Sequence, residues 1–237
     1  MIDELCIGGR KCRLFGADNP ALILIQPSAR HENATLEAEA RMIAELSDLP
    51  FVLATIELED WTLDLMPWWD GNISRDPEAG KRGQETLEYI LSELVPELEK
   101  LYGHLPLIIG GYSLGGLFAL WASMQTDTFN AVAAASPSVW IHNWLPYAKK
   151  HVPMADDVYL SLGDQEERVR NQAIARVGDN LRAQFELLKE QLGQEHCALV
   201  WERGNHFSDS EGRLARAFAW CFRAVESPSG KNMVGKR

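Results

Sequence analysis

The chain is poor in cysteine and has no long apolar run. Its 237 residues include four cysteines, none of them in a Cys-x-x-Cys pair: Cys6, Cys12, Cys197 and Cys221. A disulfide framework is unusual in a chain of this length, so we expect free thiols in a cytoplasmic protein. No stretch approaches the ~18 apolar residues of a transmembrane helix, and the acidic start Met1-Ile2-Asp3-Glu4 predicts no signal peptide. We therefore expect no membrane partner.

Positive charge is also scarce. Lys and Arg number 23 against 34 Asp and Glu, which gives a formal net charge of −11. A negative chain repels the phosphate backbone, so we expect no nucleic-acid partner. The basic segment at the end falls within residues 226–237, for which we predict a flexible tail. The His and Cys spacings predict no metal site, and nothing in the sequence calls for a cofactor.

The composition, 46% hydrophobic and 24% charged, is that of an ordinary globular protein. Short Val-, Ile- and Leu-rich runs alternate with helical patterns. The predicted strands cover 21–25, 51–56, 105–109, 131–135, 158–162 and 197–201. The predicted helices cover 37–46, 84–101, 114–124, 171–192 and 211–225. This alternation predicts an α/β fold with a mostly parallel central sheet and helices on both faces. We expect one domain over residues 1–237, without a large cap domain.

Three segments depart from this alternation. The turn at 7–10 predicts an antiparallel hairpin at the sheet edge. Pro96 falls inside the predicted helix 84–101 and should kink or split it. The stretch 59–83 is Trp-rich and has no clear periodicity, and long irregular loops in compact domains are usually functional.

The segment Gly111-Tyr112-Ser113-Leu114-Gly115 follows a buried strand and opens a helix. This strand–turn–helix setting is the one that the Gly-x-Ser-x-Gly nucleophile elbow of an α/β-hydrolase fold requires. The sharp turn leaves no room for bulk beside the serine, which the glycines satisfy. Ser113 could instead be a simple helix cap, but a cap does not need a glycine on either side. We therefore predict Ser113 as the nucleophile.

A serine nucleophile needs a base and an acid, which follow it in the order Ser, acid, His in this fold. His206 lies in a loop between the last strand and the last helix, the place expected for the base. The acid should follow the strand 158–162, where three carboxylates compete: Asp164, Glu166 and Glu167. Hydrolases of this fold often place the acid three residues after a glycine that ends the strand, which favours Glu166. Asp164 is the rival.

The oxyanion hole of such an enzyme needs two backbone N–H donors. Leu114, directly after the nucleophile, should supply one. The other should come from the loop expected after residues 21–25, which begins with Gln26 and Pro27. Proline has no N–H, so we choose Ser28, with Gln26 or Ala29 as alternatives.

Three segments resemble the “putative esterase” branch of the α/β-hydrolases, which includes enterobactin esterases and is related to esterase D. They are the elbow 111–116, Ser136-Pro137-Ser138-Val139-Trp140, and the Trp-bearing loop 60–68. The resemblance implies an esterase with substrate contacts from Trp68 and Trp140, although packing is an equally good account of these tryptophans. The sequence has Gln26-Pro27-Ser28 where many members have His-Gly. No cationic cluster for a ferric siderophore is evident, so an uncharged or small ester fits at least as well as enterobactin.

The sequence thus predicts a serine esterase that acts on a small-molecule ester through an acyl-enzyme. A thioesterase or peptidase could use the same three residues. A catalytically silent binding module of the same fold is the alternative from another class. Oligomeric state and acyl group are not encoded in any motif.

Overall fold

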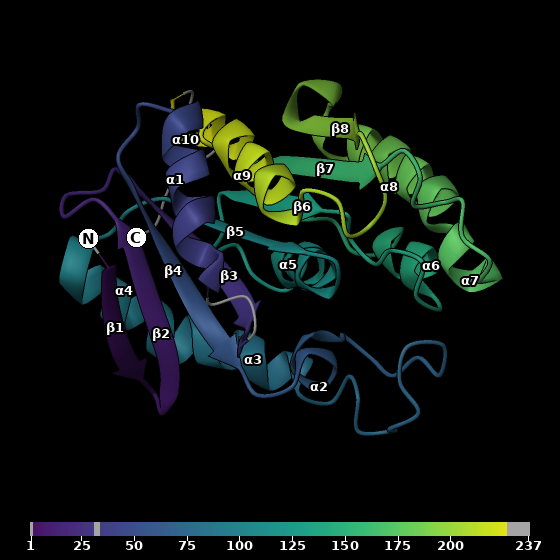
Figure 1. Ribbon diagram of the computed structural model, residues 1–237, viewed down its shortest axis with the longest axis horizontal. Helices are drawn as coiled ribbons and strands as arrows, with labels where there is room; N and C mark the ends of the chain where they lie inside the picture. Colours follow the sequence, from purple (N-terminus) through teal and green to yellow (C-terminus); the bar gives the residue numbers. More distant parts are fainter. Residues whose placement is uncertain (1, 31–33, 227–237) are drawn as a thin grey trace.

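The computed structural model describes residues 2–30 and 34–226, which form an eight-stranded sheet of order β1-β2-β4-β3-β5-β6-β7-β8 (Figure 1). Of the predicted tail 226–237, Glu226 ends a helix, and residues 227–237 lie outside the described residues. The strands are β1 (Ile2–Ile7), β2 (Arg10–Gly16), β3 (Leu22–Ala29), β4 (Phe51–Leu58), β5 (Leu107–Tyr112), β6 (Ala131–Ala135), β7 (Asp157–Gly163) and β8 (Cys197–Glu202). The pairs from β4 through β3 to β8 are all parallel.

Helices cover both faces of this sheet. They are α1 (Leu36–Leu46), α2 (Trp61–Leu65), α3 (Gly83–Tyr89), α4 (Val95–Tyr102), α5 (Leu114–Ser123), α6 (Trp144–Ala148), α7 (Gln172–Ala175), α8 (Val177–Leu192), α9 (Ser210–Cys221) and α10 (Arg223–Glu226). A π-helical turn, η2 (Ile90–Leu94), joins α3 to α4, and a 3₁₀ turn, η3 (Gln194–His196), precedes β8. The α/β fold predicted from the alternating pattern is confirmed.

The core consists of two clusters on opposite sides of the sheet. Side chains alternate across a strand, so Leu22 and Leu24 of β3 pack with α1 and α9, whereas Ile23 and Ile25 pack on the side of α3, α5 and α8. Figure 1 shows α1 and α9 side by side over one face. Because the strands are covered on both faces, they read as continuous apolar runs in the sequence.

The N-terminal hairpin lies at the sheet edge, as predicted. β1 pairs antiparallel with β2, and Ile7 faces Arg10 across the turn. Gly8 and Gly9 in that turn have φ angles of 53° and 81°, a region that glycine enters without strain. β2 in turn pairs antiparallel with β4.

Pro96 splits the predicted helix 84–101. It stands near the start of α4, where its missing N–H is tolerated. Just before it, the N–H of Val95 reaches back five residues to the carbonyl of Ile90, which closes the π-helical turn η2. The other two long predicted helices are also divided, 171–192 into α7 and α8 and 211–225 into α9 and α10.

The prediction that a loop begins at Gln26 and Pro27 is wrong, because β3 continues to Ala29. Ser28 is opposite Glu57 of β4, and β5 pairs with β3 only through residues 23–25. The end of β3 therefore has a neighbouring strand on one side only, the setting in which a strand tolerates proline. Ser28 lies within a strand rather than in the loop expected from the sequence.

The irregular stretch 59–83 contains one short helix, α2. Its start is fixed by Asp60, whose carboxylate accepts the N–H groups of Thr62 and Leu63. All four cysteines are free thiols. Within residues 2–30 and 34–226, no helix is both long and apolar enough to cross a membrane.

Substitution of Phe218 tests how much the apolar cluster beneath α9 contributes to the stability of the fold. Its side chain is fully buried, and we expect Phe218→Ala to lower the free energy of unfolding by about 3–5 kcal/mol through the cavity it leaves. Urea unfolding measures the change. The matched control is Phe207→Ala, since Phe207 is 91% exposed and its removal should alter stability by no more than about 0.5 kcal/mol. Equal losses in the two variants would contradict the prediction.

Candidate active site

Ser113 stands at a sharp turn between β5 and α5. Its backbone has φ 58° and ψ −116°, a strained conformation for a residue with a side chain. Three backbone hydrogen bonds hold it: the N–H of Ser113 donates to the carbonyl of Ala135 at 3.0 Å, and its carbonyl accepts from the N–H groups of Leu117 and Ser138, each at 3.1 Å. A Cβ on Gly111 would lie 2.5 Å from the backbone carbon of Gly115, so this turn requires glycine there.

His206 lies in the loop between β8 and α9, and its ring links Ser113 to Glu166. Nε2 lies 3.0 Å from Oγ of Ser113, and Nδ1 lies 2.7 Å from Oε2 of Glu166. Tyr112 holds this loop in place, because its hydroxyl donates to the carbonyl of His206 at 2.8 Å. The structure thus brings together the three residues predicted as nucleophile, base and acid.

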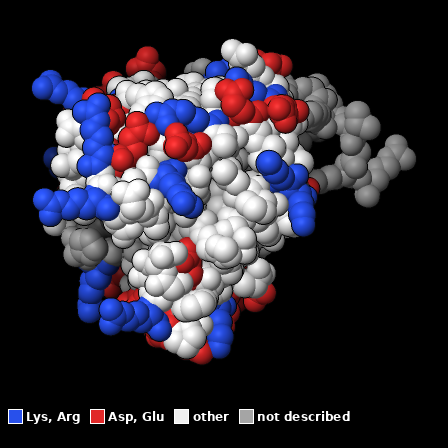
Figure 2. All heavy atoms as spheres, turned by 90° about the vertical axis from the view of Figure 1, so that its right-hand side faces the viewer, with Lys and Arg blue, Asp and Glu red and all other residues white. Residues whose placement is uncertain are grey.

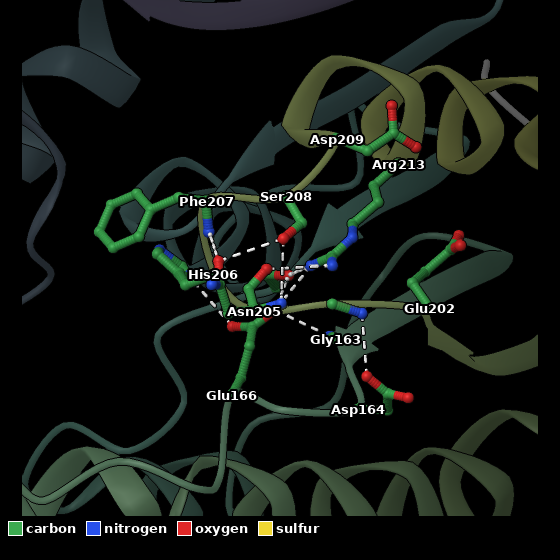
Figure 3. A network of polar contacts seen from close by, with 12 residues as sticks. Gly163, Asp164, Glu166, Glu202, Asn205, His206, Phe207, Ser208, Asp209 and Arg213 are labelled. Carbon is green, nitrogen blue, oxygen red and sulfur yellow. Dashed lines mark hydrogen bonds and ion pairs between the residues drawn. The ribbon is translucent and has the colours of Figure 1, made fainter.

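Glu166 follows Gly163, the last residue of β7, and its carboxylate is buried. Oε1 accepts hydrogen bonds from the N–H of Gly163 at 2.8 Å and from the hydroxyl of Ser136 at 2.7 Å. The guanidinium of Arg213 donates to the same oxygen at 2.8 Å (Figure 3). Oε2 is left to face His206.

The pKa of Glu166 is set by opposing effects. Burial raises it, but the hydrogen bonds from His206, Ser136 and the Gly163 N–H outweigh burial and lower the pKa below its ordinary value of 4.5. Glu166 is therefore a carboxylate at neutral pH, able to orient the His206 ring and to stabilise positive charge on it.

Arg213 is a fully buried arginine that the sequence reasoning missed. Besides Glu166, its guanidinium donates to the Tyr112 hydroxyl at 3.1 Å and to the carbonyls of Arg203 and Asn205, each at 3.1 Å. A Cβ on Gly163 would lie 2.7 Å from it, so the glycine at the end of β7 makes room for the charge. One signal could have revealed Arg213: it occupies a position in the buried stripe of α9, otherwise apolar or glycine.

The two rival carboxylates are engaged elsewhere. Asp164 accepts the N–H of Gly204 at 2.9 Å, and Glu167 pairs with Arg182 at 3.1 Å. Of the three carboxylates considered from the sequence, all within the described residues, Glu166 is the one in contact with His206.

The two residues predicted as oxyanion-hole donors, Leu114 and Ser28, have different surroundings. Leu114 begins α5, and among the described residues its N–H has no hydrogen-bond acceptor, as expected for the first turn of a helix. Ser28 is buried in β3, and its hydroxyl donates to the carbonyl of Ile56 at 3.2 Å. No hydrogen bond between described residues joins Ser28 to Ser113, and its role as the second donor stays a prediction.

Ser136 and Ser138 both belong to the site. In the sequence they were noted only as part of the segment 136–140 that resembles the esterase branch. The backbone of Ser136 has a positive φ of 45°, and its hydroxyl donates to Oε1 of Glu166 at 2.7 Å. The hydroxyl of Ser138 lies 3.4 Å from Oγ of Ser113.

A cavity of about 280 Å³ opens beside these groups. Its lining residues are Ser113, Ser136, Ser138, Trp140, Glu166, Val169, Ile174, Val177, Asn205, His206 and Phe207. Trp140 lines the cavity, and its role as a substrate contact stays a prediction, whereas Trp68 is not among the described lining residues. Trp68 instead packs against Tyr147 and Trp144 and donates its indole N–H to the carbonyl of His142 at 2.9 Å.

Two other features of the described residues bear on the choice of site. A larger hollow of about 500 Å³ lies between α1 and the start of β4, and it includes none of the predicted site residues. We place the candidate site at the smaller cavity, because the perturbed carboxylate and the histidine converge there. No group of three His, Cys, Asp or Glu side chains in the described part could hold a metal ion.

The sheet order, the elbow at the end of β5 and the loop that carries His206 are those of the α/β-hydrolase fold. The family described as “Putative esterase” matches residues 50–217, and the chain belongs to this esterase family. A search of curated proteins finds no match.

Solved structures agree in fold. The siderophore hydrolase EstB from Aspergillus nidulans is similar with 17% identity and a TM-score of 0.71, covering 97% of this chain and 96% of that one. An IroE-like serine hydrolase from Shewanella oneidensis is similar with 15% identity and a TM-score of 0.75, covering 94% and 80%. The enterobactin esterase FES from Shigella flexneri is 18% identical with a TM-score of 0.65, covering 95% of this chain and 60% of its own.

Because the ion pair between Arg213 and Glu166 is buried, removal of one partner should cause a large loss of stability. We expect Arg213→Met to lower the free energy of unfolding by about 3–5 kcal/mol, because Glu166 is left buried without its cation. Chemical denaturation measures this loss. The double variant Arg213→Met/Glu166→Gln should lose less than the sum of the two single variants.

The matched control is Arg182→Met, which breaks a half-exposed pair with Glu167 and should cost at most about 1 kcal/mol. Additive losses in the double variant, or a loss at Arg182 as large as at Arg213, would contradict the coupling.

Proposed function

We propose that the protein hydrolyses carboxylic esters through an acyl-enzyme formed on Ser113. The observation that carries the proposal is the hydrogen-bonded series from Ser113 Oγ to His206 to Glu166, with distances of 3.0 and 2.7 Å. Membership of an esterase family supports it. Neither a metal nor an organic cofactor takes part in the proposed reaction.

The first steps of the proposed reaction form a tetrahedral intermediate on Ser113, which leads to the acyl-enzyme. Oγ of Ser113 attacks the ester carbonyl carbon while Nε2 of His206 accepts the hydroxyl proton. Nδ1–H of His206 donates to Glu166, which stabilises the imidazolium without taking its proton. The Leu114 N–H, at the positive end of α5, and a second donor at the end of β3 stabilise the oxyanion. Ser28 is our choice for that donor, with Gln26 or Ala29 as alternatives.

The remaining steps release the products. The tetrahedral intermediate collapses, the carbon–oxygen bond to the alcohol breaks, and His206 gives its proton to the leaving oxygen. Water then attacks the acyl carbonyl with His206 as base, and the acid leaves as Ser113 regains its proton. The same steps cleave thioesters and amides, so a thioesterase or peptidase is the alternative within this chemistry.

A fluorophosphonate probe tests the nucleophile. We expect the probe to label Ser113, located by mass spectrometry of the digested protein. Ser113→Ala should abolish labelling and lower kcat/KM for p-nitrophenyl acetate by roughly 10⁴-fold or more. Ser92→Ala, an exposed serine on η2, is the control and should keep full activity. An unlabelled Ser113 would favour a silent binding module, and faster cleavage of a matched thioester or peptide would favour the alternative enzymes.

The choice of acid is tested separately by single-turnover acylation. Glu166→Gln should slow acylation by about 10²–10⁴-fold, because the His206 ring loses the carboxylate that orients it. Asp164→Asn should stay within about threefold of the unchanged protein. Far-UV circular dichroism checks that both variants fold. Collapse of the rate in Asp164→Asn alone would show that our choice is wrong.

A further inference from the structure

The described residues that line the cavity beside Ser113 are of two kinds. The polar ones include the serine hydroxyl groups and the His206–Glu166 pair. The apolar ones are Trp140, Val169, Ile174, Val177 and Phe207. At about 280 Å³ the cavity is near the lower limit for small-molecule sites, so it suits one compact group of a substrate.

The described lining of the cavity offers no Lys or Arg side chain to pair with an anion. Glu166 is the only Asp, Glu, Lys or Arg among its described lining residues, and its oxygens are already bonded to His206 and Arg213. Arg168, Arg170 and Arg176 belong to the same stretch of chain as some of the apolar lining residues, yet none of them is part of that lining. A charged group placed here would lose its hydration without gaining an ion pair, which is costly.

Phe207 is the apolar lining residue that reaches furthest into solvent. It directly follows His206, and at 91% it is the most exposed of the large hydrophobic side chains described. Its ring meets His206 edge-on, with 5.5 Å between the ring centroids. Figure 3 shows it pointing away from the polar network. Val169, 40% exposed, also reaches the surface at this cavity.

Single exposed hydrophobic residues are common and need no special account. Phe207 differs because it is continuous with the wall of a cavity that contains the proposed nucleophile. The face at the carboxyl ends of the strands is turned to the viewer in Figure 2, and uncharged residues cover much of its middle. Contact with an apolar ligand would remove the Phe207 side chain from water, which favours binding.

We infer that the ester substrate carries an uncharged hydrocarbon or aromatic group that fills this cavity, with Phe207 and Val169 as specificity-determining contacts at its mouth. The inference rests on the proposed esterase function and names the substrate class of that site. A polyanionic ester, such as a ferric siderophore, has no Lys or Arg partner among the described residues that line the cavity. The apolar group belongs either to the acyl side or to the alcohol side of the ester.

Two ester series test the inference and separate the two sides. The first varies the acyl chain of p-nitrophenyl esters from acetate through butyrate to octanoate, and the second varies the alcohol of acetate esters from ethyl to hexyl. In one series kcat/KM should rise about fourfold per added methylene until the cavity is filled. That series identifies the side that occupies the cavity. A flat response in both series would overturn the inference.

An anionic group should be rejected on the side that occupies the cavity. The matched pair is p-nitrophenyl valerate against p-nitrophenyl hemisuccinate on the acyl side, or the acetates of pentanol and 4-hydroxybutyrate on the alcohol side. We expect kcat/KM for the anionic ester to be at least tenfold lower. Equal or faster cleavage of the anionic ester would overturn the inference.

A substitution tests the role of Phe207 directly. Phe207→Ala should lower kcat/KM for the best long ester by about tenfold more than for the shortest ester of the same series. Val152→Ala, an exposed apolar residue outside the lining set, is the control and should leave that ratio unchanged. An equal loss on long and short esters would show that Phe207 does not select the substrate.

Failure of the inference differs visibly from failure of the proposed function. If no ester is cleaved and the fluorophosphonate leaves Ser113 unlabelled, the proposed function is overturned and the inference with it. If Ser113 is labelled and esters are cleaved without regard to length or charge, the inference alone is overturned.

Discussion

The geometry of the site depends on one buried carboxylate with both oxygens committed. Oε1 of Glu166 is held by Gly163, Ser136 and Arg213, and Oε2 faces His206. These groups come from the end of β7, the end of β6, helix α9 and the loop before it. A buried charge that lacks its partners is costly, so the four segments have to be in place together. The proposed base is therefore oriented by the fold as a whole.

Arg213 joins this polar site to the apolar core. The same helix buries Leu214 and Phe218 against the sheet, on the face opposite α5. The packing of α9 thus decides where the guanidinium reaches Glu166. Two glycines leave the necessary space: a side chain on Gly110 would collide with Phe218, and one on Gly163 would collide with Arg213. The position of His206 consequently depends on apolar packing on the far side of the sheet.

Much of this arrangement can be read from the sequence because it is encoded locally. The strand before Ser113, the glycines around it and the chain order of Glu166 and His206 all follow from short patterns. The extent of β3 could not be read, because Pro27 indicates a turn unless it is known that β5 stops pairing with β3 at Ile25. Arg213 could not be predicted as a site residue, because its partner Glu166 is 47 residues away in the chain. For Trp68 the sequence left both substrate contact and packing open, and the structure shows it packed against Trp144 and Tyr147.

Arg213 holds the His206 loop by backbone atoms, the carbonyls of Arg203 and Asn205, and Tyr112 holds the carbonyl of His206. These bonds hold the loop through carbonyl groups, which every residue type has, and none of them involves the side chain of Phe207. Substitution of Phe207, which lines the cavity, can therefore reshape the mouth of the cavity while the imidazole keeps its place. The loop separates the part of the enzyme that must stay constant from the part that natural variation or engineering can alter.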